Sequence, residues 1–234
     1  MKPLIAALLL VIALPVSAAP HPFGAMDLVM MDRVSDQVLS PDGKTVALHL
    51  RETDYAANKG RNSIWSVPFA GGKPTRLTDA ALNATTPRWS ADGSSVYFLA
   101  AKDGVNQLWR VPAQGGEADA VGTLSLDIGS YKLSPDGKSV LFSVELFVDC
   151  AKDAAPIACT KKRLDKPAED KATGMLFTEG FVRHWDTWSD GRRSQLMIAA
   201  IGADGNLGEP KLLTGGIDGD IPSKPFGDDS EYAF

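Results

Sequence analysis

Cysteine, histidine and strong positive charge are all scarce in this sequence. It contains 2 Cys and 3 His, and its formal net charge is -5. Two cysteines without a nearby His or a second Cys pair cannot complete a tetrahedral zinc site. We therefore expect no metal and no other cofactor. No basic stripe is present to neutralise phosphates, which excludes nucleic acid as a partner.

Long apolar runs are also missing, apart from one at the N-terminus. That run extends from Leu4 to Val16, whereas a membrane-spanning helix needs about 20 residues. Lys2 precedes it, and the small residues before Ala19 are typical of a signal-peptidase site. We predict a signal peptide over 1–18, with a membrane anchor as the alternative. The mature chain, 19–234, is then expected to be periplasmic or secreted and not attached to a membrane.

A short turn motif is present in three copies. Each copy has Ser, then Pro or Ala, then Asp-Gly, and each is followed by an alternating apolar stretch. The copies are Ser40-Pro41-Asp42-Gly43, Ser90-Ala91-Asp92-Gly93 and Ser134-Pro135-Asp136-Gly137. Pro presets the first corner, Asp bonds its own backbone and Gly accepts a positive φ. Each copy predicts a tight turn leading into a β-strand.

A second motif repeats with nearly the same period. Ile64-Trp65-Ser66-Val67-Pro68 matches Leu108-Trp109-Arg110-Val111-Pro112, so the two tryptophans are 44 residues apart. A period of roughly 40–45 residues with several short strands indicates a β-propeller. We predict an all-β fold, an incomplete propeller of about three four-stranded blades plus the start of a fourth. The predicted limits are 34–80, 84–124 and 128–215 for the blades and 216–234 for the stub.

The third predicted blade is longer than the others, and both cysteines fall in the extra length. We interpret 149–180 as a surface insertion, and we expect 181–188 to form a long hairpin with 194–201. Cys150 and Cys159 lie nine positions apart in an exported chain. An oxidising compartment favours a local disulfide over two unpaired thiols.

The last residues resemble those before an earlier turn. Tyr232-Ala233-Phe234 resembles Tyr131-Lys132-Leu133, which directly precedes the third copy of the turn motif. A fourth copy would be due next, so we interpret the sequence as a fragment of a longer protein. Three blades leave an open sheet edge, which favours association with another chain. We therefore expect that copies of this chain can form a homo-oligomer.

The blades resemble those of the prolyl oligopeptidase family, in its exported acylaminoacyl-peptidase and dipeptidyl-peptidase-like branch. The resemblance rests on the three turns, on Asp32-Arg33-Val34-Ser35-Asp36, on Arg183-His184-Trp185-Asp186-Thr187-Trp188 and on Lys224-Pro225-Phe226-Gly227. It implies a propeller that filters peptide substrates for a C-terminal α/β-hydrolase domain carrying a Ser-Asp-His triad. No Gly-x-Ser-x-Gly nucleophile motif occurs here, so we assign no catalytic residue to this chain.

A polar and aromatic cluster in the third blade is the candidate substrate-binding site. Its members are Glu179, Arg183, His184, Trp185 and Asp186. On a straight strand His184 and Asp186 would share one face, as a base and its orienting group do. Without a serine nucleophile nearby we favour packing of the aromatic residues within the blade. Binding of a peptide terminus or backbone through Arg183 or Glu179 is the second interpretation.

Two other functions compete with a peptidase propeller. One is a non-enzymatic periplasmic propeller that binds a protein partner, similar to TolB. That group has an α/β domain ahead of the propeller, and here the first blade begins by about Val34. The other is an enzyme with its site in the central channel. Such a site needs convergent carboxylates or metal ligands from several blades, and the repeat positions do not supply them.

Overall fold

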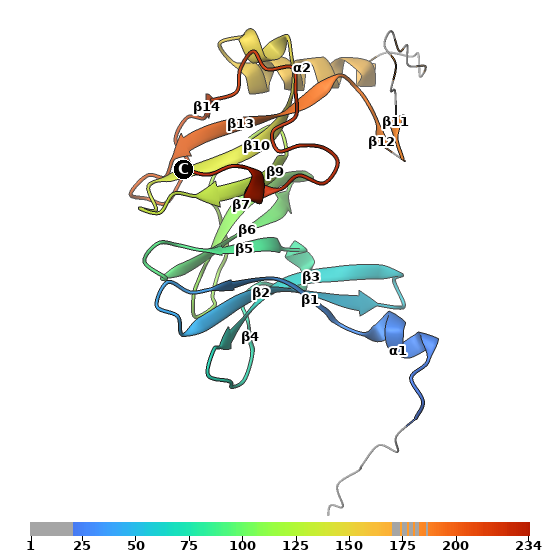
Figure 1. The fold of residues 1–234 in the computed structure, drawn as a ribbon, viewed down its shortest axis with the longest axis vertical. Helices are drawn as coiled ribbons and strands as arrows, with labels where there is room; N and C mark the ends of the chain where they lie inside the picture. Colours follow the sequence, from blue (N-terminus) through green and yellow to red (C-terminus); the bar gives the residue numbers. More distant parts are fainter. Residues whose placement is uncertain (1–20, 170–173, 175–176, 178–179, 181–182, 186) are drawn as a thin grey trace, which may run out of the picture.

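Three four-stranded antiparallel sheets, stacked along the long axis of the molecule, make up most of the structure (Figure 1). This computed structural model describes residues 21–169, 174, 177, 180, 183–185 and 187–234. The first sheet is preceded by the short helix α1 (Ala25–Met30). The predicted all-β class and the incomplete propeller architecture are confirmed.

The first two sheets are simple up-and-down meanders. Their strands are β1 (Arg33–Leu39), β2 (Thr45–Asp54), β3 (Lys59–Pro68) and β4 (Thr75–Arg76), then β5 (Thr85–Trp89), β6 (Ser95–Lys102), β7 (Val105–Pro112) and β8 (Asp119–Ala120). The 3₁₀ helix η1 (Ala80–Leu82) connects the two sheets. Hydrogen bonds join each strand to the next in the order of the chain.

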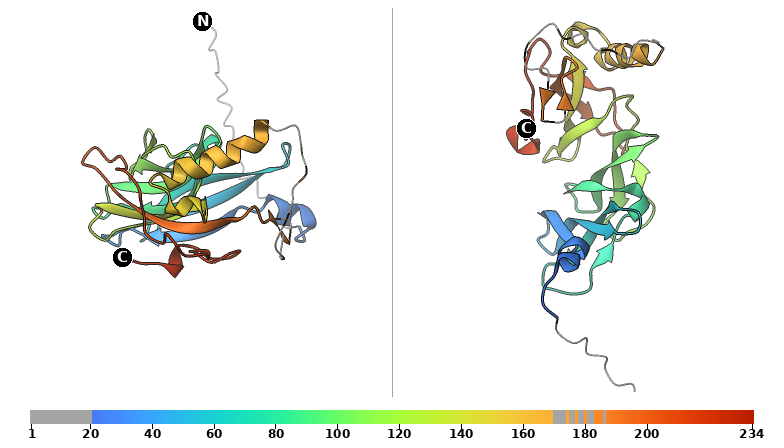
Figure 2. Two further views of the ribbon diagram at one scale, coloured as in Figure 1. Left: turned by 90° about the horizontal axis from the view of Figure 1, so that it is seen from above. Right: turned by 90° about the vertical axis from the view of Figure 1, so that its right-hand side faces the viewer.

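The third sheet is interrupted by a long connection. Its strands are β9 (Ile128–Leu133), β10 (Ser139–Phe147), β13 (Arg192–Ala200) and β14 (Lys211–Leu212). Between β10 and β13 lie η2 (Cys150–Lys152), α2 (Pro156–Glu169), β11 (Arg183–His184) and β12 (Thr187–Trp188). After β14 the chain ends with η3 (Asp229–Glu231). Figure 2 shows α2 on the third sheet, at the end of the stack remote from α1.

The repeated turn motif has the same hydrogen bonds in all three sheets. In each copy the Ser hydroxyl donates to the Asp carboxylate, at 2.6, 2.7 and 2.6 Å. That carboxylate also accepts the backbone N–H two residues further on, at 3.0–3.1 Å. The glycines of the three copies have φ values of 72°, 70° and 70°, a region that favours Gly. The shared chemistry of the motif therefore produces the same turn before β2, β6 and β10.

The hydrophobic core lies between the sheets. One cluster joins the first and second sheets around Ile64, Phe98 and Val111. A larger cluster joins the second and third sheets around Tyr131 and Phe142. Apolar residues alternate along each strand, so each sheet can present one face to each neighbour. The predicted blade tryptophans Trp65, Trp89 and Trp109 are half-buried.

The expected long hairpin between 181–188 and 194–201 is wrong. Strand β13 pairs with β10 along its whole length, from Ser139↔Ala200 to Phe147↔Arg192, and it also pairs with β14. Apolar residues on β13, such as Leu196 and Met197, are buried in that central position. Burial within the sheet therefore decides the pairing of this strand. Among the residues that the structure describes, β11 and β12 pair only with each other.

Candidate functional site

The hairpin β11–β12 projects from the third sheet, on the same side of the molecule as α1 and the β2–β3 turn (Figure 1). Arg183 pairs with Trp188 and His184 pairs with Thr187, so the chain reverses direction between His184 and Thr187. Trp185 lies in the left-handed region with φ of 49°. The straight strand assumed from the sequence is therefore wrong.

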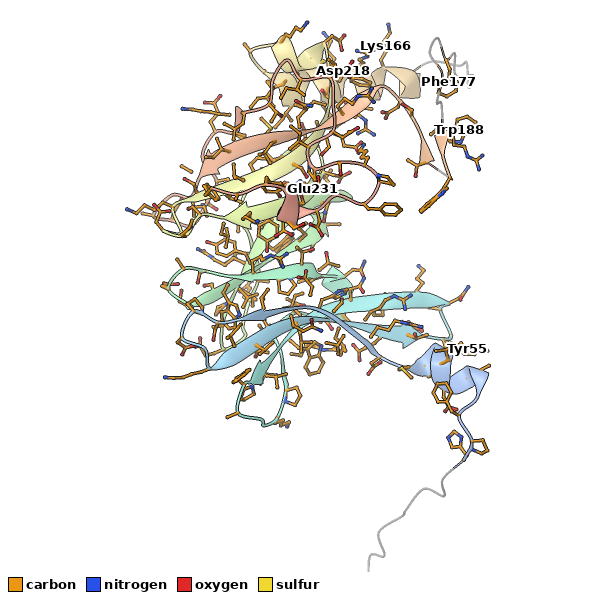
Figure 3. The ribbon with its side chains drawn as sticks, viewed as in Figure 1. Tyr55, Lys166, Phe177, Trp188, Asp218 and Glu231 are labelled. Atoms are coloured by element: carbon orange, nitrogen blue, oxygen red, sulfur yellow. A yellow bond between two sulfur atoms is a disulfide. The ribbon has the colours of Figure 1, made fainter. Side chains whose placement is uncertain are left out.

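Aromatic rings gather around this hairpin in two pairs. Trp188 stacks on Phe177 with ring centroids 5.6 Å apart (Figure 3). Trp185 packs against Phe226 with ring centroids 5.3 Å apart. Trp185, Trp188 and Phe226 remain 68%, 53% and 74% exposed. We call these four residues the aromatic cluster. Large aromatic groups this exposed favour contact with a ligand or with another protein surface.

Arg183 connects the two pairs of the aromatic cluster. Its guanidinium carbon lies 5.4 Å from the centroid of the Trp188 ring, within the range of a cation–π interaction. Its Nε donates to the carbonyl oxygen of Trp185. The structure therefore brings together Arg183 and Trp185 of the predicted site. It adds Trp188 from the same 183–188 motif, Phe226 from the Lys224-Pro225-Phe226-Gly227 segment, and Phe177, which no sequence motif singled out.

The other predicted site residues lie outside what the structure describes. Glu179 and Asp186 are outside the described residues, and for His184 only the backbone is described. Their part in substrate binding stays a prediction.

The loop that carries Phe226 is tied to the third sheet by ion pairs. Lys224 pairs with Glu145 on β10 and lies 3.9 Å from Asp220. Arg192, the first residue of β13, lies 3.3 Å from Glu145 and 2.7 Å from Asp190. Both cations named here have a carboxylate partner, and the three carboxylates exceed the two cations by one charge, so these ion pairs leave no positive charge free for a ligand. They position Phe226 beside Trp185.

The insertion is closed at its start by a disulfide. Cys150 and Cys159 are bonded, with Cα atoms 5.6 Å apart, which joins η2 to the first turns of α2. Arg163 on α2 lies 4.0 Å from the Phe147 ring centroid and donates to Asp149 at 2.7 Å. The buried Thr160 hydroxyl accepts the Phe147 N–H at 3.3 Å. These contacts hold α2 against the end of β10.

A partly buried ion cluster joins all three sheets. Arg88 on β5 donates to Asp36 of the first sheet at 2.8 Å and to both carboxylate oxygens of Asp229 at 3.0–3.1 Å. Burial alone would lower the pKa of Arg88, but the charge of Asp36 and other nearby groups raises it above its ordinary value. The neighbouring Tyr131 hydroxyl donates to the carbonyl of Thr86 at 2.8 Å, and burial raises its pKa. This cluster stabilises the stack.

The described residues also bear on metal binding and on membrane insertion. Within the described ranges, no group of three His, Cys, Asp or Glu side chains is placed to hold a metal ion. Among the same residues, no helix has the length and apolarity needed to cross a membrane.

Comparison with known proteins identifies relatives of this chain. Dipeptidyl-peptidase 5 of Porphyromonas gingivalis is 32% identical over 205 residues, which are 87% of this chain and 28% of that protein. Dipeptidyl-peptidase 5 of Porphyromonas endodontalis is 27% identical over 207 residues, 88% of this chain and again 28% of the relative. The chain thus spans less than a third of the length of these two relatives.

Solved structures agree on the fold. The acylaminoacyl peptidase of Pyrococcus horikoshii matches with a TM-score of 0.55 at 15% identity, over 79% of this chain and 26% of that one. The AtxE2 isopeptidase also matches with a TM-score of 0.55 at 15% identity, over 80% of this chain and 31% of the other. Residues 34–163 match the family described as the TolB beta propeller domain. This chain therefore belongs to the TolB β-propeller domain family.

Proposed function

We propose that this chain is the non-catalytic, substrate-gating propeller part of a longer, exported serine-type peptidase that hydrolyses peptides. The observation that carries the proposal is the 32% identity to a dipeptidyl-peptidase over 87% of the chain. The proposal includes the signal peptide, the periplasmic or secreted location and the blade limits expected from the sequence. It also includes a C-terminal α/β-hydrolase domain as the part that cleaves the peptide.

The side of the molecule that carries the aromatic cluster supports docking of another domain. Helix α1 has no buried residue, although most of its side chains are apolar. Met26 and Leu28 are 54% and 56% exposed, and Phe23 just before the helix is 66% exposed. In Figure 3, Tyr55, Phe177 and Trp188 lie on this same side. An apolar surface of this kind favours a protein interface, and the hydrolase domain is the partner that we assign to it.

The free face of the first sheet supports the presence of further blades. Residues on this face are half-buried, whereas their equivalents in the second sheet pack against the first sheet. They are Val46, Leu48 and Trp65, which correspond to Val96, Phe98 and Trp109. The same apolar pattern on a covered face and on a free face indicates that a sheet covers the free face in the longer protein.

A non-enzymatic propeller that binds a protein partner is the second candidate. The family match over 34–163 is to the TolB beta propeller domain and favours it as well. The two candidates differ in what surrounds the propeller. A peptidase needs a reactive serine in an additional domain, and a binding propeller does not.

The intact mass of the native exported protein distinguishes the two candidates. The extract would first be treated with a fluorophosphonate probe, and the labelled residue would be mapped by peptide mass spectrometry. A labelled protein several times heavier than 24.9 kDa, with these peptides at its N-terminus and the label outside them, would support the peptidase. Absence of such a label from a heavier native protein would favour the binding propeller.

The aromatic cluster provides a sharper test within the peptidase. An aromatic contact contributes about 0.5–1.5 kcal/mol, so Trp185→Ala in the full-length enzyme is expected to raise KM for dipeptide substrates about 2- to 12-fold. Because the cluster belongs to the part of the enzyme that we propose to be non-catalytic, kcat should change little. Phe69→Ala is the matched control, since Phe69 is also exposed (68%) but follows the end of β3 that lies opposite the β2–β3 turn. Equal effects of the two variants would contradict peptide binding at the cluster.

A further inference from the structure

Four polar side chains form a continuous hydrogen-bonded array from β1 to the connection after η1. Ser35 and His49 are cross-strand partners on β1 and β2, and the Ser35 Oγ lies 2.9 Å from the His49 Nδ1. On the other side of the ring, His49 Nε2 lies 2.9 Å from Oδ1 of Asn62 on β3. Asn62 in turn contacts Asn83, the residue that ends η1.

The backbone determines the direction of every hydrogen bond in this array. The backbone N–H of Asn62 donates to Asn83 at 3.1 Å, which identifies the contacting Asn83 atom as the amide oxygen. The side-chain nitrogen of Asn62 donates to the same oxygen at 2.9 Å, so the Asn62 amide oxygen faces His49. That oxygen can only accept, so His49 carries its hydrogen on Nε2. The His49 Nδ1 lone pair is then directed at the Ser35 hydroxyl, which donates to it.

The strand geometry presents Ser35 to solvent. A β-bulge begins directly after Ser35, and its first residue, Asp36, has a left-handed φ of 52°. Bulges of this kind redirect a neighbouring side chain. The Asp36 carboxylate is held by Arg88 at 2.8 Å, which fixes the bulge. Ser35 is exposed, whereas His49 and Asn62 are half-buried, so the hydroxyl is the accessible end of the array.

We infer that Ser35 is a reactive nucleophile and a site of covalent modification by activated acyl or phosphonyl compounds. A nucleophile bonded to a base, with the base oriented by a third group, is the arrangement that activates a hydroxyl. His49 Nδ1 is the base, and Asn62 is the positioning residue that maintains its tautomer. This inference does not depend on the proposed peptidase function.

The chemical step is a simple displacement. With a fluorophosphonate, the Ser35 Oγ forms a bond to phosphorus and the hydroxyl proton passes to His49 Nδ1. The phosphorus–fluorine bond breaks, and the departing fluoride leaves as HF once the imidazole has returned the proton. With an activated ester, Oγ bonds to the carbonyl carbon and the phenol leaves in the same way. No oxidant or other reactant is required.

The test is labelling of the native exported protein that contains this chain with a fluorophosphonate probe, followed by peptide mass spectrometry. Label on Ser35 in the unaltered chain is the expected result, and its absence from Ser35 would overturn the inference. The map also separates this label from one on a catalytic serine in an additional domain. The label on Ser35 is measured in the unaltered protein, so the result does not depend on whether any variant folds.

Variants of His49 and Asn62 then test the roles of these two residues in activating Ser35. His49→Gln removes the base and is expected to slow labelling at least about tenfold. Asn62→Leu should slow it similarly, whereas Asn62→Asp keeps an acceptor for the His49 Nε2 hydrogen and should restore most of the rate. Ser94→Ala is the matched control, since the Ser94 hydroxyl donates to a carboxylate at 2.8 Å and has no imidazole partner. Labelling of a folded His49→Gln variant at the wild-type rate would refute activation by the array.

Discussion

Arg88 on β5 bonds the first sheet and the C-terminal 3₁₀ helix η3, and its replacement gives a quantitative test of how the stack is held together. Its guanidinium bonds Asp36 of the first sheet and Asp229, which is 141 residues away in sequence. The Arg88 side chain is 21% exposed, and those of Asp36 and Asp229 are 31% and 19% exposed. Arg88→Met retains most of the aliphatic stem while removing every one of these hydrogen bonds.

The expected cost follows from this intermediate burial. Breaking a buried ion pair by removing one partner costs about 3–5 kcal/mol, because a charge is left uncompensated. An exposed pair contributes only about 0–1 kcal/mol. Because solvent still reaches all three groups in part, we expect Arg88→Met to lower the free energy of unfolding by about 2–3 kcal/mol. Arg61→Met is the matched control, since Arg61 pairs with Asp54 at 3.1 Å but is 45% exposed, and it should cost less than about 1 kcal/mol.

Urea unfolding followed by tryptophan fluorescence measures both variants, since the half-buried Trp89 lies next to Arg88. A double-mutant cycle with Asp229→Asn isolates the pair, and we expect a coupling free energy of at least about 1 kcal/mol. Hydrogen exchange should show the segment that contains η3 opening more readily in Arg88→Met. The reasoning is refuted if Arg88→Met costs no more than Arg61→Met, or if the cycle with Asp229→Asn is additive.

Two further predictions concern the disulfide and a turn carboxylate. Removing the Cys150–Cys159 disulfide by the double change to Ser should cost about 2–3 kcal/mol locally and expose α2 to trypsin at Lys161 and Lys162; unchanged cleavage rates would contradict this. Hydrogen bonds from the Ser90 hydroxyl and the Ser94 N–H lower the Asp92 pKa from 3.8 to about 2. The ionised carboxylate therefore stabilises the fold fully at neutral pH. That stabilisation is lost as the pH falls from about 4 to about 2. An NMR titration should place the Asp92 midpoint near 2 and move it upward in Ser90→Ala, and a midpoint near 3.8 in the unaltered chain would be inconsistent with the turn hydrogen bonds.

The repeated parts of the fold could be predicted from the sequence because their chemistry is local. A Ser, an Asp and a Gly within four residues determine each turn, and the alternating apolar residues that follow determine the strand. The same hydrogen bonds at Asp42, Asp92 and Asp136 show why three copies gave one consistent prediction. Local interactions of this kind need no knowledge of the rest of the chain.

The parts that occur once could not be predicted in the same way. The pairing of β13 with β10 depends on burial of Leu196 and Met197 within the third sheet, across a connection that includes α2. Alternation along 183–188 suggested a straight strand, but the pairing Arg183↔Trp188 requires a reversal. Phe226 packs against Trp185 although the two residues are 41 positions apart, in a loop whose Lys224 pairs with Glu145 on β10. The spacing of residues in the sequence does not predict contacts of this kind between distant segments.

The same distinction explains why the Ser35 array is visible only in three dimensions. Ser35 and His49 are 14 residues apart, and the bulge after Ser35 decides which residue of β1 faces His49. Asn62 and Asn83 are 21 residues apart and belong to different structural units, β3 and the connection to the second sheet. The tautomer of His49 therefore depends on how the first two sheets are joined. A displacement of η1 that broke the Asn83 contact would free the Asn62 amide to rotate, and the direction of the Ser35 hydrogen bond would no longer be fixed.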